Sequence, residues 1–304
     1  MLLFTHPVML AHAPPRGHPE RPARLQAVLE GLVPLKLTAR EAPMAARAEI
    51  ARVHAGAYID SLEAAFARPG GVALDPDTFV SPASREVAYR AAGAVVAAVN
   101  AVLADEDEAA FCAVRPPGHH AEPARAMGFC LFDNAAIGAL HALAAHGLSR
   151  VAVVDIDVHH GNGVEAVAQG EPRLFYASAH QAPFYPGTGQ AGVRGPAGNI
   201  LNVPLPAGTD GPAWRAAMEK HVLPALDAFA PELLIVCAGF DAHADDPLAG
   251  LALTEEDYAW AGAALRRLAL RRCNGKVVST LEGGYHLAAL KRAVAAYVEA
   301  QQRG

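Results

Sequence analysis

Residues 151–163 read VAVVDIDVHHGNG, and this stretch decides the fold. An apolar β run acquires carboxylates only at its C-terminal end, and two histidines and two glycines follow before the next helical pattern. Successive side chains of a strand alternate between its faces, so Asp155, Asp157 and His159 would point roughly the same way if the extended conformation continued. A buried strand with polar groups at its exit is typical of α/β proteins, which place their ligands beyond the carboxyl ends of parallel strands.

Similar apolar runs alternate with longer, alanine-rich helical patterns along the sequence. The strands that we expect are 2–5, 110–114, 151–156, 174–177, 200–203, 233–238 and 276–280. The expected helices are 21–31, 82–103, 133–145, 163–169, 212–229, 255–271 and 286–301. This alternation predicts a three-layer α/β/α fold with a mostly parallel central sheet. No repeat or low-complexity linker interrupts the pattern, so we expect a single catalytic domain over residues 1–304.

Three further predicted strands also end in polar groups. Asp241 follows the run 233–238, the segment Glu282-Gly-Gly-Tyr285 follows the run 276–280, and Arg115-Pro-Pro-Gly-His-His120 follows the run 110–114. Because the carboxyl ends of parallel strands meet at one edge of a sheet, we expect all four exits to converge on one site. The Gly- and Pro-rich segment 181–198 is long for a plain connection, and loops of that length are usually functional.

The residue types at these exits suit a metal ion. Asp157, His159 and Asp241 would offer two carboxylates and one imidazole, a set of three ligands that leaves a position open for water and substrate. Two carboxylates cancel most of the charge of a divalent ion, so the ion alone would acidify its water only weakly. A separate general base is then needed.

The adjacent histidines His119 and His120 are the candidates for that base. Tyr285, which follows a Gly-Gly pair, could donate a hydrogen bond to the oxyanion of a tetrahedral intermediate. Together with the expected metal site, these side chains indicate hydrolysis of an amide.

Composition excludes several classes of function. Hydrophobic residues make up 52% of the chain and charged residues 18%, enough apolar material for a sheet buried on both faces. A net charge of −6 without any basic block argues against nucleic acid as a ligand, and it is compatible with cationic substrates. Charged residues, Pro or Gly interrupt every apolar stretch before it reaches transmembrane length, so we expect no membrane span.

The cysteines and the N-terminal segment indicate a reducing compartment. The four cysteines are widely spaced and form no Cys-x-x-Cys motif, so buried free thiols are expected rather than disulfides. Residues 1–7 lack the basic region and the long apolar region of a signal peptide. We therefore expect a cytoplasmic protein.

These residues resemble the histone deacetylase family of the arginase/deacetylase fold, most closely its class II branch and bacterial relatives. The motifs that carry the resemblance are Gly17-His-Pro-Glu-Arg-Pro-Ala-Arg24, Leu74-Asp-Pro-Asp-Thr-Phe-Val-Ser-Pro82, Arg115-Pro-Pro-Gly-His-His120, Gly128-Phe-Cys130, Asp155-Ile-Asp-Val-His-His-Gly-Asn-Gly163, Tyr185-Pro-Gly-Thr-Gly189, Ala238-Gly-Phe-Asp241 and Glu282-Gly-Gly-Tyr285. They follow the family order over nearly the whole chain, and together they are highly specific.

The resemblance implies a zinc ion held by Asp157, His159 and Asp241. It also implies that His120 is the general base and acid and that His119 is its electrostatic partner. Iron(II) or cobalt would bind the same ligands similarly.

By the family pattern, Asp155 pairs with His119 and Asn162 pairs with His120. Class I members carry Asp where this chain has Asn162, so the amide should change the basicity of His120. Tyr285 matches the catalytic tyrosine of active members.

The resemblance also implies a substrate tunnel with Gly128, Phe129 and Tyr185 in its wall. Tyr185 departs from the commoner Phe and adds a hydroxyl at the rim. Leu248 stands where polyamine-specific relatives can carry a glutamate, and its aliphatic side chain favours acyl-lysine substrates.

Two further sites follow from the same resemblance. Arg24 matches the arginine that lines the exit path for acetate. A structural potassium ion would be bound by backbone oxygens and one hydroxyl, from Asp155, Asp157, His159, Ala179 and Ser178.

We therefore expect a zinc-dependent deacetylase that hydrolyses the amide of acetyl-lysine or a related acyl-lysine with a metal-activated water and a histidine base. The alternative within the same site is an acetylpolyamine or other small-molecule amide deacetylase. A metal-containing acyl-lysine binding protein with vestigial activity is a third reading, and a homo-oligomer stays open.

A fourth reading is a binuclear manganese enzyme of the same fold, because Asp241-Ala-His-Ala-Asp245 also fits that pattern. Such enzymes need additional carboxylates to bridge two ions. Gly161 occupies the place of one such carboxylate, so one catalytic metal is favoured.

Overall fold

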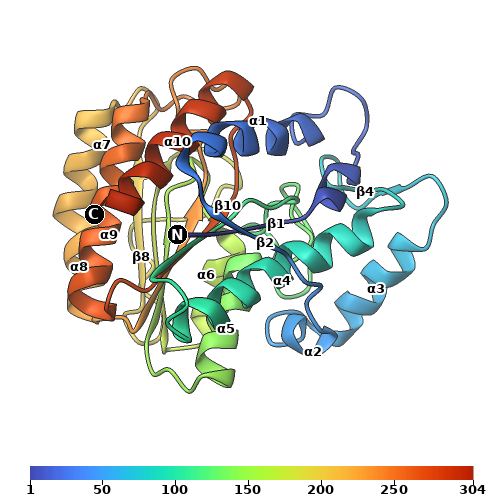
Figure 1. The fold of residues 1–304 in the computed structure, drawn as a ribbon, viewed down its shortest axis with the longest axis horizontal. Helices are drawn as coiled ribbons and strands as arrows, with labels where there is room; N and C mark the ends of the chain where they lie inside the picture. The colour runs from blue at the N-terminus through green and yellow to red at the C-terminus, as the bar shows by residue number, and fades with distance from the viewer. Residues whose placement is uncertain (304) are drawn as a thin grey trace.

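An eight-stranded sheet forms the centre of the computed structural model, which describes residues 1–303 (Figure 1). The strand order is β2-β1-β5-β10-β9-β6-β7-β8, and every neighbouring pair is parallel. The strands are β1 (Leu2–Thr5), β2 (Thr38–Glu41), β5 (Ala109–Cys112), β6 (Val151–Asp155), β7 (Leu174–Gln181), β8 (Ile200–Leu205), β9 (Leu233–Ala238) and β10 (Val277–Leu281). The prediction of a mostly parallel central sheet is confirmed.

Helices cover both faces of this sheet (Figure 1). One face is covered by α4 (Ser84–Leu103), α5 (Asn134–Ala145) and α6 (Asn162–Gly170). The other is covered by α1 (Pro22–Leu32), α7 (Gly211–Ala217), α8 (Leu223–Phe229), α9 (Glu255–Cys273) and α10 (Leu287–Arg303). The three layers predicted from the sequence are therefore present.

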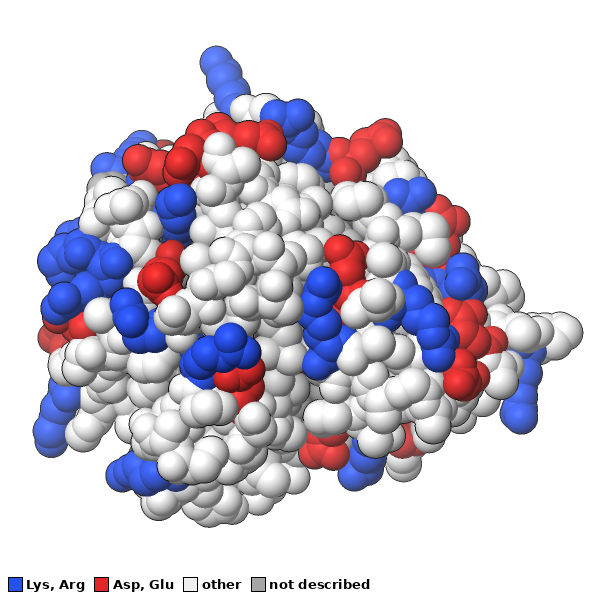
Figure 2. All heavy atoms as spheres, turned by 90° about the horizontal axis from the view of Figure 1, so that it is seen from below, with Lys and Arg blue, Asp and Glu red and all other residues white. Residues whose placement is uncertain are grey.

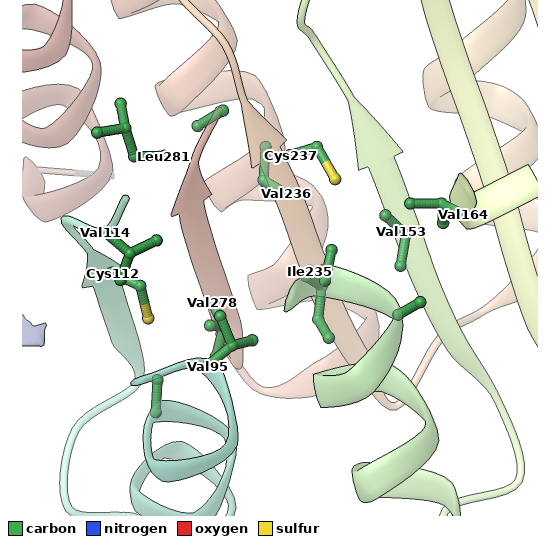
Figure 3. Close-up of a cluster of buried hydrophobic side chains, with 14 of the residues drawn as sticks. Val95, Cys112, Val114, Val153, Val164, Ile235, Val236, Cys237, Val278 and Leu281 are labelled. Atoms are coloured by element: carbon green, nitrogen blue, oxygen red, sulfur yellow. The ribbon is translucent and has the colours of Figure 1, made fainter. Parts of the chain in front are cut away.

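Figure 3 shows the part of the hydrophobic core that lies between the sheet and the helices on the α4 side. Val95 of α4 points toward Cys112 of β5 and Val278 of β10, while Ile235 and Val153 extend the cluster along β9 and β6. These five side chains are all buried. Burial of one aliphatic side chain contributes about 1.5–3 kcal/mol, so the apolar strands hold the sheet rigidly in place beneath its polar exits. The four cysteines are free and buried, as expected.

Several elements were not expected from the sequence. The edge strand β2 has the sequence TARE and is exposed along its length, so it lacks the apolar pattern of a buried strand. The short helix α2 (Arg47–Ile50), the helix α3 (Gly56–Phe66) and the antiparallel hairpin of β3 (Val72–Ala73) and β4 (Phe79–Val80) lie outside the sheet.

The single helix expected over residues 212–229 is wrong in detail. A π-helical turn, Met218–Val222, separates α7 from α8. The 3-10 turns Pro7–Ala11 and Val33–Leu35 flank α1 on either side.

Helix α4 bears on the expectation that no segment spans a membrane. By length and composition it is apolar enough to cross a membrane, and among residues 1–303 it is the one helix that passes this test. Most of it is buried, and it packs against α5, β1, β5 and β10. Its apolar character is therefore accounted for by contacts within the fold.

The charged side chains are dispersed on the face shown in Figure 2. Basic and acidic groups lie interspersed there, and no basic stripe crosses that view. A polyanion that binds through its phosphates would need such a stripe, so this face offers it no electrostatic footprint.

Candidate active site

Three metal-ligating side chains meet at the exits of two neighbouring strands. Asp157 and His159 follow β6, and Asp241 follows β9, which pairs with β6. Their ligand atoms all lie within 4.8 Å of one another. Nδ1 of His159 lies 2.9 Å from Oδ1 of Asp157 and 3.3 Å from Oδ2 of Asp241. The structure thus brings together the three ligands expected from the sequence.

The backbone between Asp155 and His159 is not extended as expected. Strand β6 ends at Asp155, whose Oδ1 accepts a hydrogen bond from the backbone N–H of Asp157 at 3.1 Å. Oδ1 of Asp157 then accepts one from the backbone N–H of His159 at 2.9 Å. Aspartate side chains that bind the backbone two residues on form turns of this kind, which compete with the strand. These turns direct the carboxylate of Asp155 toward His119. They direct that of Asp157 toward the two other candidate metal ligands.

The donor set fits a divalent metal ion. Oδ2 of Asp241 is buried and, although Nδ1 of His159 lies 3.3 Å away, it accepts no hydrogen bond of good geometry from any residue in the range 1–303. Burial and the negative charge of Asp157 raise the pKa of Asp241 to about 6, a cost that a bound cation would offset. A Cβ atom at Gly283 would lie 1.8 Å from Oδ2 of Asp241, so only glycine leaves room beside this oxygen. Two carboxylates and an imidazole are ligands typical of zinc and similar ions.

The two adjacent histidines each have a polar partner at Nδ1. Nδ1 of His119 lies 2.9 Å from Oδ2 of Asp155, and Nδ1 of His120 lies 2.8 Å from Oδ1 of Asn162. Both histidines are buried, and their ring centroids are 4.0 Å apart. These are the pairings that the family pattern implies.

The two histidines differ in basicity. Burial opposes a charge on His119, but the carboxylates of Asp155 and Asp157 outweigh it and raise its pKa well above the ordinary value. Burial and the positive charges of His119 and His159 lower the pKa of His120 well below that value. His120 is therefore the neutral member of the pair at neutral pH and the better proton acceptor.

Tyr285 is held in place from two sides. Its backbone N–H donates to Oδ2 of Asp246 at 2.7 Å. The guanidinium of Arg24 lies 4.7 Å from the centroid of its ring and donates to the carbonyl oxygens of Gly284 and Glu282. Burial raises the pKa of Tyr285 well above its usual value, so the hydroxyl stays protonated and can donate.

The side chains of His119, His120, His159 and Tyr285 line a narrow cavity of about 80 Å³. Phe129 and Tyr185 form part of its wall, and the ring of Tyr185 lies perpendicular to that of His120 at 5.1 Å. Gly128 has a φ of +57°, and a Cβ there would meet the His120 ring at 2.4 Å. Leu248, which is partly exposed, also lines the cavity. All four residues expected to form the substrate tunnel therefore line this one cavity.

Comparison with known proteins identifies the family. The model of the histone deacetylase domain matches residues 18–301. The chain belongs to the histone deacetylase family. It is 41% identical over 278 residues to the histone deacetylase-like amidohydrolase of Pseudomonas aeruginosa, which covers 88% of this chain and 73% of that protein. It is 35% identical over 289 residues to a probable deacetylase of Archaeoglobus fulgidus, which covers 92% of this chain and 80% of that protein.

A solved structure gives the same fold. The crystal structure of the HDA15 HD domain superposes with a TM-score of 0.94 at 32% identity, covering 100% of this chain and 91% of that one. The arginase/deacetylase fold is thereby confirmed, and this histone deacetylase-family chain is a hydrolase.

Several residues that support the site of this hydrolase were given no role by the sequence. Glu122 accepts a hydrogen bond from Nδ2 of Asn162 at 2.8 Å, and the hydroxyl of Tyr176 donates to Oδ2 of Asp155 at 3.2 Å. Glu122 belongs to no motif, so no sequence signal could have found it.

Three further residues, in the cavity wall or packed against residues of that wall, were not expected from the sequence. The ring of Phe184 stacks on that of His159 at 5.1 Å. His18 packs edge-on against Phe129 at 4.7 Å, and Asp77 lines the cavity. His18 and Asp77 lie in the family-like segments at residues 17–24 and 74–82. Membership of these segments was the sequence signal that could have assigned the two residues to the site.

A second metal ion has no evident ligands. A Cβ at Gly161 would lie 2.3 Å from Oδ2 of Asp155, so a bridging carboxylate cannot be accommodated there. Within residues 1–303 only Asp157, His159 and Asp241 form a group with metal-ligand spacing. His243 lies instead 3.4 Å from Glu255, in a partly exposed ion-pair cluster.

Proposed function

We propose that this hydrolase is a zinc-dependent deacetylase that cleaves the amide of an acyl-lysine. The observation that carries the proposal is the single cavity shared by His120, Tyr285 and the metal ligand His159. A zinc ion held by Asp157, His159 and Asp241 would supply a Lewis acid that polarises the amide and acidifies water.

The tautomer of His120 suits the role of general base. Nδ2 of Asn162 donates to Glu122, which turns Oδ1 of Asn162 toward His120. An amide oxygen only accepts, so Nδ1 of His120 carries the proton and Nε2 is left with a lone pair. Nε2 can then take a proton from the attacking water and return it to the leaving amine.

Two other groups favour the transition state. The hydroxyl of Tyr285 can donate to the carbonyl oxygen as negative charge develops on it. His119, kept protonated by Asp155, places a positive charge beside the same cavity.

Arg24 uses three of its five N–H groups on Gly284, Glu282 and Glu20, and the remaining two could bind a departing acetate.

The shape of the cavity supports a substrate with an unbranched aliphatic chain. Phe129 and Tyr185 leave a narrow passage, and Leu248 offers no counter-charge for a second ammonium group. Asp77, however, places a carboxylate in the same wall. This carboxylate favours the alternative substrate class, the cationic acylpolyamines.

We also propose a structural potassium ion near the exit of β6. Nε2 of His180 lies 3.0 Å from the carbonyl oxygen of Gly189 and must donate to it, so Nδ1 accepts from the hydroxyl of Ser178 at 2.8 Å. The lone pairs of Ser178 then stay available for a cation. Ser178 lies beside Asp155 in the sheet, and the remaining ligands would be backbone oxygens of Asp155, Asp157, His159 and Ala179.

The test is a comparison of kcat/KM for acetyl-lysine peptides and for acetylputrescine, with and without a chelator. The proposal predicts chelator-sensitive hydrolysis with a higher kcat/KM for the peptides. A higher value for acetylputrescine would favour the alternative. Absence of hydrolysis of both substrates by the zinc-loaded protein would exclude deacetylation.

A further inference from the structure

Glu282 carries a buried carboxylate that the mechanism above does not use. The side chain is fully buried. Its Oε2 accepts hydrogen bonds from the backbone N–H groups of Gly118, at 2.7 Å, and His119, at 3.2 Å. Gly118 and His119 lie beyond the end of β5, so no neighbouring strand satisfies their N–H groups. The carboxylate therefore supplies the partners that buried backbone donors need.

The backbone of the same residue contacts the other parts of the site. The N–H of Glu282 donates to the carbonyl of Ala238 at 3.0 Å, at the end of β9. Its carbonyl oxygen accepts from Arg24, whose guanidinium lies against the ring of Tyr285. The next N–H, that of Gly283, donates to Oδ2 of Asp157 at 2.8 Å. Residues 282 and 283 thus contact the loop that carries His119 and His120, and they contact the candidate metal ligand Asp157. They also contact Arg24, which packs against the ring of Tyr285.

A buried charge at this place is costly for the fold. Burial raises the pKa of Glu282 to about 7, although the positive charge of His119 and the N–H group of Gly118 act in the opposite direction. Oε1 accepts no hydrogen bond from the described part of the chain. An apolar side chain would fill the same space without that cost, so the carboxylate is better explained by the loop that it binds.

We propose that Glu282 is a positioning residue that fixes the His119–His120 loop relative to Asp157 and Tyr285. This inference rests on the proposed deacetylase function. Without the carboxylate, the loop that carries the base loses two hydrogen bonds and can shift relative to the substrate carbonyl. A shift of about 1 Å in a catalytic group can lower the rate by about 10²-fold.

The test compares Glu282→Ala with Glu282→Gln. Alanine removes both hydrogen bonds, and we expect kcat to fall on the order of 10²-fold with KM within about three-fold of the wild type. Glutamine keeps an acceptor oxygen but carries no charge. We expect kcat of the Glu282→Gln variant to lie within about ten-fold of the wild-type value. Amide hydrogen exchange of the peptide 115–121 should be faster in the alanine variant and close to wild type in the glutamine variant.

Asp257→Ala is the matched control. Asp257 is also a buried carboxylate that accepts a backbone N–H, from Thr254 at 2.8 Å, but it lies at the start of α9, outside the cavity wall. Its loss should lower thermal stability and leave kcat within about two-fold.

The outcomes separate the two proposals. A wild-type protein without hydrolytic activity would exclude the deacetylase function, and hydrogen exchange would then still decide whether Glu282 holds the loop. The inference is wrong if Glu282→Ala keeps the wild-type kcat or if kcat of Asp257→Ala falls by the same factor. It is also wrong if hydrogen exchange in residues 115–121 of Glu282→Ala is the same as in the wild type.

Discussion

Nδ1 of His120 lies 2.8 Å from Oδ1 of Asn162, so the partner of this ring is a neutral amide and not a carboxylate. Glu122 orients this amide, whose oxygen accepts a hydrogen bond from Nδ1–H of His120 without adding a negative charge. His120 is therefore held in one tautomer while its pKa stays low.

Asn162→Asp should raise the pKa of His120, because a carboxylate beside the ring favours the charged imidazolium. Since the base must be neutral, the acidic limb of the kcat/KM profile should move to higher pH, by on the order of one unit. The measurement is kcat/KM from pH 5 to 9. Asn100→Asp is the control, because Asn100 also contacts two histidines, His141 and His146, but lies away from the cavity. An unmoved limb, or one moved to lower pH, would contradict the role of Asn162.

Tyr285→Phe should lower kcat by roughly 10²–10³-fold, the usual cost of one lost oxyanion donor. Substrate binding and metal content should be unchanged, because Asp246 holds Tyr285 through the backbone N–H and the hydroxyl belongs to no metal-ligand group of the described residues. Tyr297→Phe is the matched control. The hydroxyl of Tyr297 is buried and lies 2.9 Å from that of Ser279, so its loss should reduce stability but not kcat. Full activity of Tyr285→Phe would remove the tyrosine from the mechanism.

His54 should make the fold sensitive to acid. Burial lowers its pKa from 6.5 to about 4. Between these pH values the unfolded chain binds a proton that the folded chain does not, so the free energy of unfolding should fall as pH decreases through this window, by about 3 kcal/mol at its lower end.

Urea unfolding of the wild type and His54→Gln between pH 7 and 4 measures this effect. The stability advantage of the wild type should shrink as pH falls, because glutamine does not titrate. His221→Gln, at an exposed position, is the control and should keep the wild-type pH dependence. A constant difference between wild type and His54→Gln would show that His54 does not contribute.

The sheet could be predicted because its strands are buried on both faces. Such strands are nearly continuous apolar runs, and β1 and β9 have the predicted boundaries. The edge strand β2 could not be found, because its exposed TARE sequence has no pattern of burial. The π-helical turn between α7 and α8 is likewise set by packing and has no signal in the helical pattern of residues 212–229.

The site was predicted well where it lies at strand exits and poorly where it depends on contacts across the chain. Asp157, His159 and Asp241 follow apolar runs, so topology alone brings them together. Glu122 reaches Asn162 from 40 residues away, a contact that only the folded chain reveals. Glu282 was seen as part of a motif, but its bonds to the backbone of Gly118 and His119 depend on the neighbouring strand.

The most direct test of the account is the metal content of the purified protein after equilibration with zinc and removal of excess ion. One equivalent per chain is expected for the wild type, and chelation should abolish activity until the metal is restored. Asp241→Ala should lose the metal, whereas Asp245→Ala, which changes a half-exposed side chain four residues on, should keep one equivalent. Two equivalents in the wild type, no bound metal, or an Asp241→Ala variant that binds zinc like the wild type would contradict a single catalytic ion held by Asp157, His159 and Asp241.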